Sequence, residues 1–219
     1  MLDYIDKNIQ ALRKEIPEDV TLIAVTKYHD DAETQAVVDA GVHDLGENKV
    51  QDLMAKMEHI TGDVRWHFIG HLQRNKVKYL IGRVVLIHSV DTLELLKTIE
   101  KESLKKGVVT EVLIQFNLAQ EDSKSGFAAE DYRMVFDFVQ TLTAVRVRGL
   151  MCIGPMTKKA DKIRKIFKQL KELYDTIKAE YHGENIDFTT LSMGMTDDYP
   201  IAIEEGATMV RIGRKIFYH

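Results

Sequence analysis

The segment TLIAVTKYHDDAETQAVVDAGVHDLG (21–46) carries a strand, a helix and a second strand in succession. Residues 21–27 and 42–46 are short runs rich in apolar residues, whereas residues 32–40 place apolar side chains three and four positions apart. Two strands joined in this way run parallel, because the helix crosses back along the face of the sheet. The segment therefore predicts one βαβ unit.

The same alternation continues along the chain. Further strands are predicted at 64–70, 84–90, 110–117, 145–151, 188–194 and 208–213, with amphipathic helices at 48–59, 93–105 and 130–141. Eight parallel strands in 219 residues fit a small closed barrel, whereas doubly wound sheets usually have fewer strands. The predicted fold class is α/β, a single (β/α)8 TIM barrel.

The two ends of the barrel pattern differ. Residues 2–14 precede the first strand and present Ile5, Ile9 and Leu12 at helical spacing, whereas the tail RKIFYH (214–219) is too short for a full outer helix. We therefore expect an extra N-terminal helix to close the ring. With only three prolines and no Gly/Ser-rich linker, the sequence predicts one domain over residues 1–219.

Composition limits the partners and the compartment. No apolar stretch is long enough to cross a bilayer, so no membrane partner is expected. A net charge of −4 argues against nucleic acid, because binding a phosphate backbone needs a concentrated basic surface. The basic run 158–178 has apolar residues at helical spacing and predicts a packed helix with a solvated face. A single cysteine, Cys152, suits a reducing compartment, so we expect a cytoplasmic protein.

Chemistry in barrels of this class lies at the carboxyl ends of the strands. The candidate site therefore consists of the residues just after each predicted strand: Lys27, Gly46, Glu47, Asn48, Gly70, His71, Ser89, Asp91, Asn117, Met151, Cys152, Ser192, Met193, Gly194, Arg211, Gly213 and Arg214.

Lys27 is the candidate nucleophile of this set. A lysine attacks an aldehyde only when it is unprotonated, which a desolvated site favours. After the last two strands, SMGM (192–195) and RIGRK (211–215) offer glycines and a serine where barrels commonly bind phosphate. The lysine and the phosphate site together predict a ligand that carries both a carbonyl group and a phosphate. The alternative is that Lys27 is a solvated strand end and that the glycines only turn the chain.

The residues also carry a family resemblance. The matching segments are AVTK (24–27), GENKVQD (46–52), WHFIGHLQRNK (66–76), KSGF (124–127), RGLMCIGPM (148–156), LSMGMTDD (191–198) and MVRIGRKIF (209–217). In them the chain resembles the pyridoxal 5′-phosphate (PLP) homeostasis proteins, which are barrel-only relatives of alanine racemase. The resemblance implies the fold of the alanine racemase N-terminal domain and PLP as the bound cofactor.

The resemblance also implies roles for single residues. Lys27 would hold PLP as an imine, Arg211 would face the pyridine nitrogen, and Asn48 would line the pocket. The phosphate would lie against Ser192, Gly194 and the backbone of Gly213 and Arg214. Many relatives have a threonine in place of Arg214, so here the backbone N–H must serve, and the guanidinium can add charge. His71 falls at a variable family position.

The implied function is PLP homeostasis, in which the chain buffers the cofactor and delivers it. Apo PLP-dependent enzymes are the candidate recipients. The expected oligomeric state is a monomer. Arginine only donates hydrogen bonds, so Arg211 would keep the ring nitrogen unprotonated and discourage carbanion chemistry. We find no racemase base opposite Lys27 and assign no catalytic residue; Cys152 is expected to be a buried small hydrophobe. The alternatives are a residual PLP-dependent racemase, a class I aldolase and a regulatory binding module.

The pair His67 and His71 does not predict a metal site. The two residues span a predicted strand end and lack the glutamate of the helical zinc motif. Trp66 and Phe68 alternate with His67, which is typical of packing in a barrel wall. No metal is expected.

Overall fold

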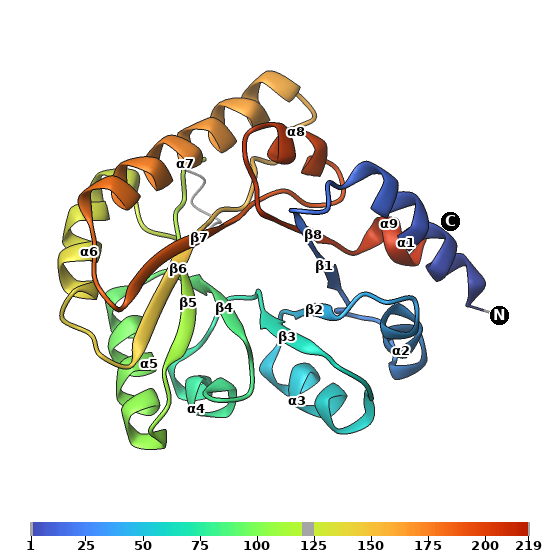
Figure 1. Cartoon of the computed structure of the whole chain (residues 1–219), viewed down its shortest axis with the longest axis horizontal. Helices are drawn as coiled ribbons and strands as arrows, with labels where there is room; N and C mark the ends of the chain where they lie inside the picture. Colours follow the sequence, from blue (N-terminus) through green and yellow to red (C-terminus); the bar gives the residue numbers. More distant parts are fainter. Residues whose placement is uncertain (1, 120–124, 219) are drawn as a thin grey trace.

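The computed structural model describes residues 2–119 and 125–218 and confirms the predicted barrel (Figure 1). Eight strands follow one another around a closed parallel barrel, and β8 pairs with β1. The strands are β1 (Thr21–Val25), β2 (Asp44–Glu47), β3 (Arg65–Phe68), β4 (Leu86–Val90), β5 (Thr110–Gln115), β6 (Val145–Met151), β7 (Ile186–Ser192) and β8 (Met209–Ile212).

Helices surround this barrel on the outside, as Figure 1 shows. They are α1 (Asp3–Glu15), α2 (Asp31–Asp39), α3 (Val50–His59), α4 (Val77–Leu80), α5 (Leu93–Lys106), α6 (Tyr132–Val139), α7 (Ala160–Glu180), α8 (Tyr199–Glu204) and α9 (Arg214–Phe217), with short 3-10 turns η1 (Arg74–Lys76) and η2 (Ala129–Asp131). The helices predicted from the sequence are all present, with ends that differ by a few residues.

The strands are shorter than most of the predicted runs. β1 ends at Val25 and β3 at Phe68, although the N–H groups of Thr26 and Ile69 still donate to carbonyl groups of β2, at 3.1 and 2.9 Å. The register shifts between β6 and β7, where Gly149 has φ +147°. A Cβ at this position would lie 1.8 Å from the carbonyl oxygen of Thr190, so only glycine fits.

α1 closes the ring, as the sequence predicts. Ile5, Ile9 and Leu12 are fully buried, and α1 packs beside α2 and α9. The Asn8 Nδ2 atom donates to the carbonyl oxygen of Ile216 at 3.0 Å, which ties α1 to α9. The two ends of the described chain lie on this side of the molecule (Figure 1).

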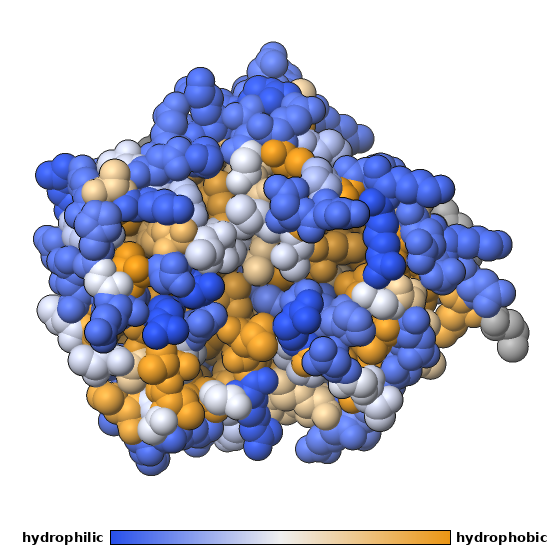
Figure 2. All heavy atoms as spheres, viewed as in Figure 1, coloured by the Kyte–Doolittle hydropathy of each residue, from blue (hydrophilic) through white to orange (hydrophobic). Residues whose placement is uncertain are grey.

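The apolar core lies mainly between the barrel and its helices. α7 is packed as predicted and buries a row of apolar residues, Ile163, Phe167, Leu170, Tyr174 and Ile177. Within the part of the chain that the structure describes, no helix has the length and apolar character to span a membrane. Figure 2 shows hydrophilic residues over much of the outer part of one face and hydrophobic residues toward its middle.

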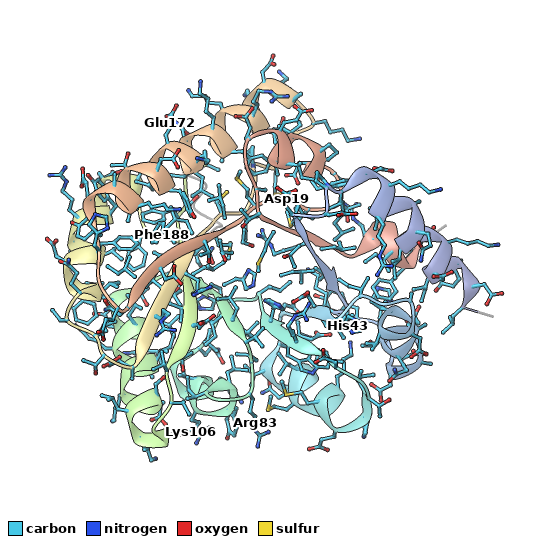
Figure 3. All side chains as sticks on the ribbon, viewed as in Figure 1. Asp19, His43, Arg83, Lys106, Glu172 and Phe188 are labelled. Atoms are coloured by element: carbon cyan, nitrogen blue, oxygen red, sulfur yellow. The ribbon has the colours of Figure 1, made fainter. Side chains whose placement is uncertain are left out.

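The barrel interior is a separate and more polar region. Leu86, Leu113 and Met151 form a small apolar cluster of their own. The strands also carry buried polar side chains, such as those of Asp44, His67 and His88, and Figure 3 shows side chains in the space that the strands enclose. Polar groups in such a place are stable only when they are hydrogen-bonded, so their partners are informative.

Candidate functional site

Lys27 lies at the carboxyl end of β1, partly exposed, between two constrained neighbours. Tyr28 has φ +70°, which is rare for a residue other than glycine and marks local backbone strain, and its ring is 76% exposed. The Nζ atoms of Lys27 and of Lys49 each lie 5.7 Å from the centre of this ring. Two amines therefore share one aromatic surface at the rim.

The residue before Lys27 is held by a buried cluster that we call the Glu47 cluster, consisting of Thr26, Glu47 and Lys56. Lys56 Nζ donates to Glu47 Oε1 at 2.7 Å and to the Thr26 carbonyl oxygen at 2.6 Å. The Thr26 hydroxyl donates to the same carboxylate oxygen at 2.6 Å. The Glu47 cluster fixes both the backbone and the side chain of Thr26. It therefore restricts the position of the Lys27 backbone, which follows directly in the chain.

Asn48 follows β2 and lies close to the segment after β3. A Cβ on Gly70 would approach the Asn48 carbonyl oxygen to 2.2 Å, so glycine is required there. The Asn48 Oδ1 atom is buried and has no hydrogen-bond partner among the described residues. A buried acceptor without a donor is costly, which makes this atom a natural contact for a ligand.

The loop after β7 is shaped by Gly194 and Asp198. Gly194 has φ +91°, and a Cβ there would lie 2.6 Å from the Cβ of Ala202. The Met195 N–H donates to Asp198 Oδ1 at 2.6 Å. Burial raises the pKa of the Asp198 carboxyl. The Gly194 carbonyl accepts from the Arg211 N–H at 3.0 Å, which joins this loop to β8.

Two residues after β8 complete that side of the rim. Gly213 precedes α9, and a Cβ there would lie 3.1 Å from the Val25 carbonyl oxygen at the end of β1. Arg214 is exposed and forms an ion pair with Asp197 in the loop after β7. The guanidinium therefore joins the two predicted phosphate loops, while the backbone N–H groups at the start of α9 have no partner within the helix.

Arg211 is the buried cation of the site. Its Nη1 donates to Ser192 Oγ at 2.7 Å and its Nη2 to the Cys152 carbonyl oxygen at 2.9 Å. Burial lowers the pKa of this guanidinium, but arginine remains charged at any ordinary pH. Cys152 is fully buried, as expected for a small hydrophobe. The remaining N–H groups of Arg211 are directional donors for a ligand.

Ser192 is also the first member of a buried row that we call the histidine chain, consisting of Ser192, His88, His67 and Asp44. Ser192 Oγ lies 3.0 Å from His88 Nδ1, and His88 Nε2 lies 3.0 Å from His67 Nδ1. His67 Nε2 lies 2.9 Å from Asp44 Oδ1. The chain runs through the barrel from the carboxyl ends of the strands to their amino ends.

Charges along the histidine chain follow from its surroundings. Burial, together with His67 and Arg211, holds the pKa of His88 well below its usual value, so His88 is neutral. Burial alone would raise the pKa of Asp44, but hydrogen bonds from Arg65 and His67 outweigh it and lower the pKa to about 2. Arg65 Nε and Nη2 donate to the two Asp44 oxygens at 2.8 and 2.5 Å.

A cavity of about 250 Å³ opens beside Asp44 at the amino ends of the strands, opposite the predicted site. Its polar and charged lining residues are Thr21, Asp44, Arg65, His67, Glu111, Arg148 and Thr190. The cavity brings solvent to the end of the histidine chain that lies farthest from Arg211.

Other predicted rim residues have partners of their own. His71 Nδ1 lies 2.9 Å from Asp91 Oδ2, and the Ser89 hydroxyl donates to the Gly70 carbonyl. The Asn117 N–H donates to the Phe127 carbonyl at 2.9 Å, which folds residues 125–127 of the KSGF motif back onto β5. Lys124 of that motif lies outside the described residues. Within the described ranges, no three His, Cys, Asp or Glu side chains are placed to hold a metal ion.

Sequence reasoning missed the partners that organise this site. It gave no role to His88 or Lys56, although both carried a signal. His88 lies two residues after inward-facing Leu86, and alternation along a strand places both inside the barrel. Lys56 follows Val50 and Leu53 at spacings of three on the buried face of α3. A polar residue at a core position predicts a buried partner.

Comparisons with known proteins agree with this geometry. The family model "Alanine racemase, N-terminal domain" matches residues 1–219. A pyridoxal phosphate homeostasis protein of Aquifex aeolicus is 44% identical over 178 residues, which cover 81% of this chain and 77% of that protein. The structure of PipY of Synechococcus elongatus with PLP bound matches with a TM-score of 0.90 and 31% identity, covering 98% of this chain and all of that one.

An alanine racemase of Clostridium difficile has the same fold. It matches with a TM-score of 0.82 at 15% identity, and the match covers 99% of this chain and 60% of the racemase. At that identity the likeness concerns the barrel alone. The Aquifex aeolicus protein, at 44% identity over most of both chains, is similar in sequence as well as in fold. The chain therefore belongs to the pyridoxal phosphate homeostasis protein family, within the alanine racemase N-terminal domain family.

Proposed function

We propose that this chain binds PLP at the carboxyl ends of the barrel strands and holds it on Lys27. Lys27 would hold the cofactor through its side-chain amine, because an unprotonated amine is a nucleophile toward the aldehyde that PLP would supply. The observation that carries the proposal is the pairing of β1 with β8, in which Ile23 lies opposite Arg211. This pairing brings an amine and a buried cation to the same sector of the rim.

The residues present fit this ligand. Arg211 has N–H groups for the pyridine nitrogen, and the buried Asn48 Oδ1 lacks a donor among the described residues. The turn at Gly194 and the backbone N–H groups of Gly213 and Arg214 suit a phosphate, because glycine allows close approach to the backbone. Ser192 Oγ accepts a hydrogen bond from Arg211 Nη1, so the serine would lie beside a ligand that Arg211 binds. Bound PLP supplies a reactive aldehyde and, with a protonated ring, an electron sink.

The chain holds the cofactor and does not use it as a catalyst. Arg211 donates hydrogen bonds and has no proton to spare for the ring nitrogen, so this residue favours the unprotonated ring. Relatives named homeostasis proteins support the same role. We propose further that the chain is a cytoplasmic monomer of one domain that releases PLP to apo PLP-dependent enzymes.

Borohydride reduction followed by peptide mass spectrometry tests the assignment of Lys27. Wild-type protein mixed with PLP should become yellow, and the pyridoxyl group should be found on Lys27. Lys49→Ala is the matched control, because both amines contact the Tyr28 ring at the same distance. Lys27→Ala should lose the label and Lys49→Ala should keep it. Full labelling of Lys27→Ala, or wild-type protein that takes up no PLP, would overturn the proposal.

Two solution assays separate a carrier from an enzyme. L-amino acids incubated with loaded protein in deuterated water should keep their α-protons, whereas a residual racemase would exchange them. Transfer of PLP to an apo-enzyme, compared with free PLP at equal concentration, tests delivery. Rapid α-proton exchange that disappears in Lys27→Ala would favour the racemase alternative.

A further inference from the structure

With Asp44 ionised, the histidine chain has two complete arrangements of its hydrogen atoms. In the first arrangement both histidines are neutral. Ser192 donates its O–H to His88 Nδ1, His88 donates from Nε2 to His67 Nδ1, and His67 donates from Nε2 to Asp44. The three contacts of 3.0, 3.0 and 2.9 Å are all satisfied. The Ser192 hydroxyl hydrogen is then committed to His88.

In the second arrangement His67 carries a proton on both ring nitrogens. It donates from Nδ1 to His88 and from Nε2 to Asp44, so neutral His88 turns its own proton to Nδ1 and donates to Ser192 Oγ. Ser192 then accepts from both His88 and Arg211, at 3.0 and 2.7 Å. The Ser192 O–H is left free to donate to a ligand.

We propose that the histidine chain is a proton-operated control of Ser192, in which a proton on His67 frees the Ser192 hydroxyl to bind an anionic oxygen of the ligand. His67 and His88 are positioning residues, since they act through Ser192 and touch no ligand. The inference rests on the proposed function, because PLP supplies the anionic oxygen.

The surroundings allow His67 to gain and lose this proton. His67 is 2% exposed but lines the cavity at the amino ends of the strands, so solvent reaches its neighbourhood. His67 Nε2 lies 2.9 Å from Asp44 Oδ1, and this contact is kept in both arrangements. The other ionisable groups that face this region are Arg65, His88, Glu111, Arg148 and Arg211.

Thermodynamic linkage gives the sign of the effect. If ligand binding favours the protonated chain, binding takes up protons, and affinity rises as the pH falls. Full coupling to one proton changes the dissociation constant by at most about tenfold per pH unit. Proton exchange by the ligand itself contributes equally in all variants that keep Lys27.

Calorimetric titration with PLP, in two buffers of different ionisation enthalpy, measures the protons taken up at one pH. Wild-type protein should take up as much as about one proton more than His67→Gln or Ser192→Ala when the titration is repeated over a series of pH values. The two variants should give the same count. A purely structural role for the histidines predicts that Ser192→Ala keeps the wild-type count, and that result would overturn the proposal.

Labelling of Lys27 by borohydride in each variant separates the two proposals. If the protein is labelled but all variants take up the same number of protons, the proposal for the histidine chain is wrong and PLP binding on Lys27 stands. If the wild-type protein is not labelled, both proposals are wrong. Asp44→Asn is a second variant for the case that His67→Gln does not fold. Its loss of charge should shift the pH dependence of PLP affinity to lower pH, and an unchanged dependence would contradict the proposal.

Discussion

The two ends of β2 each carry a buried carboxylate, yet the two groups are built differently. Asp44 begins the strand and faces the barrel interior, where it meets His67 and Arg65. Glu47 ends the strand on the outer side, where it meets Lys56 from α3. Alternation along a strand puts residues three apart on opposite faces, so one short strand supplies both.

The difference lies in where the protons can go. In the Glu47 cluster, one ammonium and one hydroxyl donate to a single carboxylate oxygen, and the other oxygen, Oε2, is buried without a hydrogen-bond partner among the described residues. The Asp44 carboxylate continues into two imidazoles, and each imidazole can exchange donor and acceptor roles. The Glu47 cluster stabilises one geometry, whereas the histidine chain can pass a change of protonation along the barrel.

Lys56→Met should give the largest loss of stability. It leaves the Glu47 charge buried without its cation, which typically costs roughly 3–5 kcal/mol. Urea unfolding at neutral pH measures the loss. The double variant Glu47→Leu with Lys56→Met is the control and should recover most of the stability, because no charge is then buried. A single variant within about 1 kcal/mol of wild type would show that the Glu47 cluster is not the rigid element.

Asp44→Asn should cost less, about 1–2 kcal/mol at pH 7, because the pair with Arg65 is partly solvated. The pKa of Asp44 is lowered to about 2 in the folded protein. Its stabilisation is therefore present above the unfolded value of about 3.9 and disappears as the pH falls through about 2. Wild type and variant should converge in unfolding curves measured from pH 5 downward, and a constant difference would contradict this linkage.

Arg65→Gln should have the smallest effect on stability, under about 1 kcal/mol, because the arginine side chain is 49% exposed. Its effect should appear in the titration of its partner. Loss of two hydrogen bonds should raise the pKa of Asp44 above about 2, as followed by the carboxyl NMR shift. An unmoved titration would mean that His67 alone sets the charge of Asp44.

The barrel and its eight strands could be predicted from the sequence, whereas the short helices α4, α8 and α9 were not predicted. The contacts of the site could be predicted only in part. All eight strands could be predicted, because they are short runs with apolar residues and most of them alternate with helical patterns. The general geometry of barrels placed Lys27, Gly194 and Arg211 at strand ends, and the structure has them there. Their roles toward PLP stay predictions.

The rest could not be predicted from the sequence because it depends on pairs that lie far apart in the chain. His88 and Ser192 are 104 residues apart, and neither carries a local pattern that names the other. Arg214 was expected to add charge to a phosphate, but its ion pair with Asp197 depends on two loops that meet only in the closed barrel. Hydrophobic periodicity orients strands and helices; it does not specify which polar side chains meet.

The seam between the first and last strands has a consequence for synthesis. Ile23 and Arg211 pair across it, so Arg211 joins the strand that precedes Lys27 only after nearly the whole chain has left the ribosome. Contacts of such large sequence separation form late, because the intervening chain must first be ordered. We therefore expect nascent chains that end before β8 to be unable to retain PLP, so that only finished molecules draw on the cell's supply of the free aldehyde.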